Sequence, residues 1–150
     1  MVYFKQIIIE GGCPMIQVIH GRKGSGKTKR IIDMANDAIK DQKGDVIFVD
    51  DDNRYMFDLR HEIRFVNASE YGMVSPETFY GFLCGMLSQN FDVTVIFIDA
   101  FLKLVHVSPN QTEWFFTSLE SLSEKRNIRF VLSVSCDDSD APEYIRKHFI

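Results

Sequence analysis

The octet GRKGSGKT at residues 21–28 constrains the fold of this chain more than any other part of its sequence. It follows an apolar run at residues 15–20, which has the length and composition of a buried parallel strand. Behind it, five apolar residues repeat at helical spacing: Ile31, Met34, Ala35, Ala38 and Ile39. The sequence therefore predicts a strand, a glycine-rich loop and a helix in direct succession, which is the context in which such an octet binds phosphate groups.

The residue types of the octet match the chemistry of a nucleoside triphosphate. Glycines let the loop bend so that consecutive backbone N–H groups point into an anion-sized hollow, and the helix adds its positive N-terminal end. Lys27 supplies a charge for the β- and γ-phosphates, and the Thr28 hydroxyl can ligate Mg²⁺. The alternative is a glycine turn that precedes a lysine by chance. The residues predicted to bind nucleotide are Gly21, Arg22, Lys23, Gly24, Ser25, Gly26, Lys27 and Thr28.

A second candidate site residue ends the apolar run TVIFID at residues 94–99. A carboxylate at the C-terminal end of a parallel strand faces the crevice where ligands bind in such sheets. Asp99 is therefore expected to hold Mg²⁺ through water or to accept a hydrogen bond from Thr28. The alternative is an ordinary aspartate that begins a loop.

The remaining sequence continues the alternation of strands and helices. Apolar runs predict strands at residues 46–49, 63–66, 93–98 and 128–134. A short helix is expected within residues 51–62, and further helices are expected to begin at Ser75, at Ser108 and near Asp140, the last two with capping boxes formed by Gln111 and Glu143. This order predicts one α/β domain at residues 15–150, a three-layer fold with a mostly parallel sheet flanked by helices.

Residues 1–14 do not continue this pattern. Glu10, Gly11 and Gly12 can be encoded by a purine-rich ribosome-binding sequence at a suitable distance from the codon of Met15. One hypothesis is that Met15 is the native start and that residues 1–14 are a non-native leader. The other is an additional edge strand at residues 3–9 followed by a glycine turn.

Composition argues against several classes of protein. The 21 acidic and 17 basic side chains give a net charge of −4, which is no signal for nucleic-acid binding. The apolar runs are far shorter than the ~20 residues of a membrane helix, and residues 1–14 lack a signal-peptide pattern. Cys13, Cys84 and Cys136 have no metal-ligand spacing, so we expect reduced thiols. These features predict a cytoplasmic protein with no membrane partner.

The octet and the strand ending in Asp99 together resemble the Walker A and Walker B elements of the P-loop NTPase superfamily, over residues 15–135. The chain is most similar to the RecA-like branch, which places a strand with a polar tip between the two Walker strands. Residues 128–135 fit that strand, with Ser133 and Ser135 as the tip. As a whole the chain is similar to short stand-alone bacterial P-loop proteins labelled "twitching motility PilT-like". It lacks the histidine box and N-terminal sensory domain of true retraction ATPases.

The resemblance also implies an acid that orients the attacking water. Many P-loop hydrolases place a glutamate directly after the Walker B aspartate, where this chain has Ala100. RecA-type proteins instead place the acid at the end of the strand that follows the P-loop helix, which makes Asp51 and Asp52 the catalytic candidates. The alternative is a solvated acidic turn that caps the next helix.

The expected function is therefore Mg²⁺-dependent binding of ATP with weak or partner-stimulated ATPase activity, in a switch or assembly factor. The absence of an N-K-x-D motif favours ATP over GTP. A protein partner is expected, and the resemblance also allows a homo-oligomer. Two alternatives stay open: a small-molecule kinase of the nucleoside type, and a nucleotide-binding module without turnover.

Overall fold

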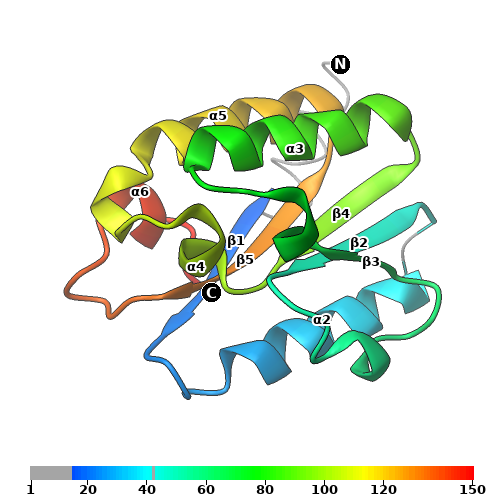
Figure 1. Cartoon of the computed structure of the whole chain (residues 1–150), viewed down its shortest axis with the longest axis horizontal. Helices are drawn as coiled ribbons and strands as arrows, with labels where there is room; N and C mark the ends of the chain where they lie inside the picture. The colour runs from blue at the N-terminus through cyan, green and yellow to red at the C-terminus, as the bar shows by residue number, and fades with distance from the viewer. Residues whose placement is uncertain (1–14, 42) are drawn as a thin grey trace.

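A five-stranded parallel sheet forms the centre of the structure, a computed structural model that describes residues 15–41 and 43–150 (Figure 1). Both hypotheses for residues 1–14 concern a segment outside the described residues. The strand order is β1-β5-β4-β2-β3, and all neighbouring pairs are parallel. The strands are β1 (Ile16–Gly21), β2 (Asp45–Asp50), β3 (Arg64–Asn67), β4 (Val93–Ile98) and β5 (Arg129–Ser135).

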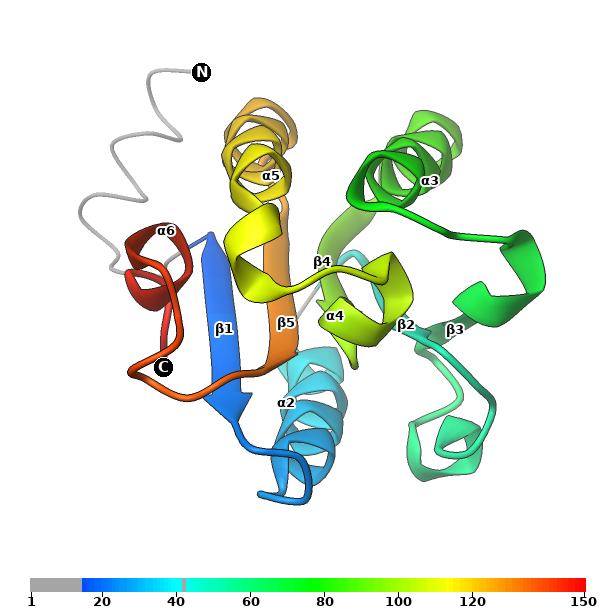
Figure 2. The same cartoon turned by 60° about the vertical axis from the view of Figure 1, so that its left-hand side comes forward.

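Helices cover both faces of this sheet, so the predicted α/β class with a parallel sheet between helices is confirmed (Figures 1 and 2). One face carries α2 (Lys27–Asp41). The other carries α3 (Pro76–Gln89), the short α4 (Phe101–Val105) and α5 (Glu113–Arg126), while α6 (Glu143–Arg146) lies beside β1. Among the described residues, no helix has the length and apolar character needed to cross a membrane.

The two faces of the sheet bury separate apolar clusters. Beneath α2, Ile31 and Ala35 pack with Phe48 and Phe97 of the sheet. The opposite cluster is built around aromatic rings, and Phe115 lies at its centre, with ring centroids 4.7 Å from Phe101 and 5.9 Å from Phe79. The strands are apolar on both sides because each side is covered, as is typical of parallel sheets.

The crossovers bring distant parts of the sequence to one edge of the sheet. The prediction that residues 128–135 form a strand between the strands of residues 15–20 and 93–98 is confirmed, because β5 lies between β1 and β4. The chain passes from β1 over two strand positions to β2, which leaves a crevice at the carboxyl ends of the strands. The glycine-rich loop, the end of β2, Asp99 and the tip of β5 all open onto this edge.

The structure confirms some of the predicted helix starts and contradicts others. Ser75 caps α3 and forms a capping box with Thr78. Ser108 and Gln111 form the predicted box, but on a single 3₁₀ turn, η3 (Pro109–Gln111), because the backbone leaves the helical region at Thr112 and α5 begins at Glu113. The box predicted for Asp140 and Glu143 is wrong: Pro142 holds an extended backbone, and α6 begins only after it.

No α-helix forms between β2 and α3, where the structure has only two 3₁₀ turns and the short strand β3. Residues 51–62 contain only the 3₁₀ turn η1 (Met56–Asp58), and β3 leads into a second turn, η2 (Ala68–Tyr71). Asn36 of α2 fixes the first of these turns: its Nδ2 donates to the Asp58 carbonyl at 3.0 Å, and its Oδ1 accepts from the Arg60 N–H at 2.8 Å. The segment after β2 is therefore held against α2.

Phe115→Ala tests the aromatic cluster. Removing a fully buried ring that contacts α3 and α4 leaves a cavity, so we expect the free energy of unfolding to fall by about 3–5 kcal/mol in urea denaturation. Phe57→Ala removes a ring that is 89% exposed and should change stability by less than about 0.5 kcal/mol. Equal effects of the two substitutions would contradict the packing described.

Candidate functional site

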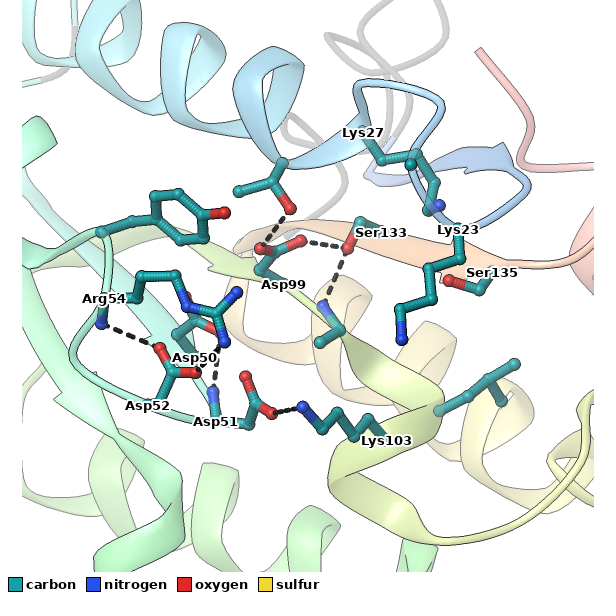
Figure 3. A pocket seen from close by; sticks show the side chains of 15 residues that line it. Lys23, Lys27, Asp50, Asp51, Asp52, Arg54, Asp99, Lys103, Ser133 and Ser135 are labelled. Carbon is teal, nitrogen blue, oxygen red and sulfur yellow. Dashed lines mark hydrogen bonds and ion pairs between the residues drawn. The ribbon is translucent and has the colours of Figure 1, made fainter.

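A cavity of about 350 Å³ opens at the carboxyl edge of the sheet. Its wall comes from the glycine-rich loop and the start of α2, the segment after β2, the start of α4 and the tip of β5 (Figure 3). Of the predicted site residues, the structure brings together Lys23, Gly24, Lys27, Thr28, Asp51, Asp52 and Asp99. Gly21, Arg22, Ser25 and Gly26 complete the loop without lining this cavity, and Arg22 turns away to Asp137, with Nε 3.1 Å from Oδ1.

The loop depends on glycine at two positions. Gly26, just before α2, has φ +92°, a backbone conformation that residues other than glycine rarely adopt. At Gly21, a Cβ atom would lie 2.5 Å from the Ser25 hydroxyl oxygen, so a larger residue would displace the loop. The tight path of the loop therefore requires glycine at positions 21 and 26.

Lys27 folds back over the loop. Its Nζ donates to the Arg22 carbonyl at 2.8 Å, and burial lowers the pKa of its ammonium group against the opposing attraction of Asp99. Lys23 reaches from the loop into the cavity (Figure 3). An anion in the cavity would therefore meet two lysines that approach from the same loop.

Asp99 is the best-connected side chain of the site. It is only 4% exposed, and its Oδ2 accepts from the Thr28 hydroxyl at 3.0 Å, which is the contact predicted from the sequence. Its Oδ1 accepts from the Ser133 hydroxyl, whose oxygen accepts in turn from the Ala100 N–H at 2.9 Å (Figure 3). Because a buried charge needs partners, this network holds the start of α2 and the ends of β4 and β5 together.

Ala100 adopts an unusual backbone conformation directly beside Asp99. Its φ of 55° and ψ of 45° lie in the left-handed region, which costs alanine on the order of 1–2 kcal/mol. This turn ends β4, begins α4 one residue later and directs the Ala100 N–H to Ser133. Strained conformations of this kind persist where surrounding contacts hold them, often at functional sites.

Asp51 and Asp52 each have a basic partner. The Asp51 carboxylate pairs with Lys103 of α4 at 2.8 Å. Burial alone would raise the pKa of Asp51, but the Lys103 contact and the neighbouring Asp50 hold the pKa below its ordinary value. Asp52 accepts from the Arg54 N–H at 2.8 Å and from its guanidinium at 3.1 Å. These contacts close a local turn. They resemble the alternative in which Asp52 caps the next helix, but only a 3₁₀ turn follows.

Asp50 is a further residue of the site, which the sequence patterns do not single out. It is 2% exposed, lines the cavity and is the last residue of β2. Its Oδ1 accepts from the Asp51 N–H at 2.7 Å, whereas Oδ2 has no hydrogen-bond partner within the described part of the chain. Burial, aided by the carboxyl groups of Asp51 and Asp99, raises the pKa of Asp50 to about 8. The sequence signal for Asp50 was its position as a charged residue directly after the apolar residues of β2.

The site therefore combines oxygen ligands with positive charge. The Thr28 hydroxyl and the Asp99 carboxylate are oxygen donors suited to a hard cation such as Mg²⁺. Carboxylate oxygens of Asp50, Asp51 and Asp52 also lie within 4.8 Å of one another. Lys23, Lys27, Arg54 and Lys103 line the same cavity and favour an anionic ligand.

Comparison of the chain with protein-family models gives no match, and a search of curated proteins finds none that is significantly similar.

The buried Asp50 should make stability depend on pH. Between the ordinary pKa of 3.8 and the folded-state pKa of about 8, the folded protein holds a proton that the unfolded chain releases. The free energy of unfolding should therefore fall as pH rises through this window, by up to about 1.4 kcal/mol per pH unit from this group.

Urea denaturation without divalent cations, from about pH 5 to about pH 8, should show a smaller decline for Asp50→Asn than for the wild type. Asp37→Asn is the matched control, because it changes an exposed carboxylate on α2. Parallel stability profiles for the wild type and Asp50→Asn would show that Asp50 does not retain its proton in the folded state.

Proposed function

We propose that this chain is a P-loop protein of the RecA-like type that binds MgATP in the cavity at the carboxyl edge of the sheet. One observation carries the proposal: the Thr28 hydroxyl and the Asp99 carboxylate, 71 positions apart in the sequence, meet at 3.0 Å beside the glycine-rich loop. The position of β5 between β1 and β4 supports the RecA-like arrangement.

The residues present fit a magnesium ion. Mg²⁺ prefers oxygen ligands and usually keeps several of its waters. The Thr28 hydroxyl oxygen would ligate the ion while its hydrogen stays donated to Asp99 Oδ2, and the Asp99 carboxylate would hold the ion through water. The metal would neutralise phosphate charge and orient the triphosphate.

The loop and its lysines would hold the phosphates. Backbone N–H groups of the loop and the start of α2, a helix of 15 residues, are suited to an anion. Lys27 Nζ would exchange the Arg22 carbonyl, now at 2.8 Å, for phosphate oxygens. That exchange costs little because both partners accept a hydrogen bond from the same ammonium group.

Turnover would be slow without a partner. Ala100 cannot orient water, and the catalytic candidates Asp51 and Asp52 are engaged with Lys103 and Arg54. Asp50 joins them as a third candidate, because its Oδ2 has no partner among the described residues and its side chain lines the cavity. We propose that a protein partner releases one of these acids, which would make the chain a switch or assembly factor. A binding module without turnover is the alternative that Ala100 favours.

MgATP should stabilise the folded protein through linkage, by about 2.7 kcal/mol at a hundredfold excess over Kd. Lys27→Ala should remove most of this stabilisation in a thermal-shift assay, since the lysine serves the ligand and its present bond is only to a loop carbonyl. Lys40→Ala, in the exposed last turn of the same helix, should respond to MgATP like the wild type. The phosphate-site assignment fails if Lys27→Ala binds MgATP as well as the control.

Substitutions of the four aspartates of the site should separate binding from turnover. Asp99→Asn should weaken magnesium-dependent nucleotide binding, because a metal-linked carboxylate stabilises the bound ground state. Asn substitutions at Asp50, Asp51 and Asp52 should leave binding largely intact, and the one that removes the water-orienting group should slow single-turnover hydrolysis by ~10²–10⁴. Wild-type rates in all three variants would place the acid elsewhere. A wild type that binds MgATP without hydrolysis would favour the binding module.

A further inference from the structure

We propose that the outer face of α3 and α5 is an interface on which a second copy of this chain docks, with each helix antiparallel to its counterpart in the other copy. The two helices lie side by side and run in the same direction over one face of the sheet (Figures 1 and 2). No residue of either helix lines the phosphate cavity, so the inference does not depend on the proposed function.

The exposed side of α3 carries almost no charge. Glu77, in the first turn, is the single charged residue among the 14 of this helix. Farther along, Gly81, Gly85 and Ser88 are exposed at spacings of four and three residues, which places them on one side of the helix. Among the described residues, a Cβ atom at either glycine would meet no neighbouring group within 4 Å. Another helix can therefore approach α3 closely on this side.

The exposed side of α5 is uncharged between its ends. Trp114 is 50% exposed although its ring also lies edge-on against Tyr80 of α3. Thr117 and Ser121 are exposed on the same helix, whereas Glu120 between them pairs with two residues directly after α6, at 2.9 and 3.0 Å. Exposed tryptophan and tyrosine are enriched at protein interfaces. The α3–α5 surface therefore consists of uncharged residues of both helices: Tyr80, Gly81, Gly85, Trp114, Thr117 and Ser121.

The charges at the two ends of this surface have opposite sign. Glu77 and Glu113 lie in the first turns of α3 and α5. The last turn of α5 holds Lys125 and Arg126 beside a single acid, Glu124. A two-fold axis across the middle of the helices would place the acidic end of one copy on the basic end of the other, and it would also pair the helix dipoles head to tail. Charge complementarity thus favours a second copy in antiparallel orientation.

The middle of each helix is suited to lie at such an axis. In a two-fold contact, residues at the axis meet their own counterparts, so like charges there would repel. Gly81 and Gly85 flank the middle of α3, and Thr117 and Ser121 flank the middle of α5. These small uncharged residues allow α3 to pack on α3 and α5 on α5 of the second copy.

Sedimentation velocity without nucleotide, from about 5 to about 500 µM protein, tests the inference. We expect a dimer with a Kd on the order of 10–100 µM, because a face only two helices wide is a small interface. Gly81→Lys places like charges at the axis and should raise the Kd roughly tenfold or more. The variant should still fold, since lysine favours helix more than glycine does and the position is open. Asp37→Lys, on the exposed side of α2, should dimerise like the wild type.

Charge reversal tests the orientation. Glu113 and Lys125 lie at equal distances from the position midway between Thr117 and Ser121, so each faces the other across the axis. Glu113→Lys and Lys125→Glu should each raise the Kd by about threefold or more, because each change turns two symmetry-related attractions into repulsions. The double variant should recover the Kd of the wild type, since every acid again faces a base.

Three results would overturn the inference. A wild type that stays monomeric at the highest concentration would leave the α3–α5 surface to a partner of another kind. An unchanged Kd in Gly81→Lys would show that the dimer forms through a different surface. A double variant that remains as weak as the single ones would exclude the antiparallel arrangement. Because no nucleotide is present, none of these results bears on the phosphate site.

Discussion

The contacts of the Asp99 carboxylate hold the whole carboxyl edge of the sheet together. Asp99 is 4% exposed, so an unpaired charge at this position would be costly. Its two oxygens take hydrogen bonds from Thr28 at the start of α2 and from Ser133 near the tip of β5. Movement of either element would leave one oxygen of the carboxylate without its present partner, and the left-handed turn at Ala100 depends on the same network.

The order of the strands makes that network attainable. Residues far apart in the sequence meet because β5 lies between β1 and β4, while β2 returns on the other side of β4. The glycine-rich loop and the acids after β2 thus face each other across the end of β4. Basic and acidic side chains come together there, and Asp50 adds a carboxyl group whose Oδ2 has no hydrogen-bond partner among the described residues. A cavity with this arrangement is suited to a ligand that brings both anionic groups and a cation.

The sequence predicted those parts of the structure that depend on the spacing of a few neighbouring residues. The octet, the strand ending in Asp99 and the Ser75 cap each depend on short-range spacing, and the structure places them accordingly. The role of Asp50 could not be predicted in this way, because it depends on where β2 ends and on how closely Asp99 approaches. The pairing of Asp51 with Lys103 depends on α4, whose five residues are too few to show a helical period.

The aromatic residues at the start of α5 differ in burial although they lie in one helical turn. Phe115 and Phe116 are fully buried, whereas Trp114 is 50% exposed. It rests edge-on against Tyr80 of α3, with ring centroids 5.4 Å apart. His20, the residue before the glycine-rich loop, stacks on Phe149 with ring centroids 3.7 Å apart.

A crystal structure of the protein with Mg²⁺ and a non-hydrolysable ATP analogue tests the central claim most directly. We expect phosphate oxygens within hydrogen-bond distance of Lys27 Nζ, which will have left the Arg22 carbonyl, and a metal ion at Thr28 Oγ1. Phosphates bound away from the glycine-rich loop, or a bound analogue with no metal ion at Thr28, would contradict the proposed site.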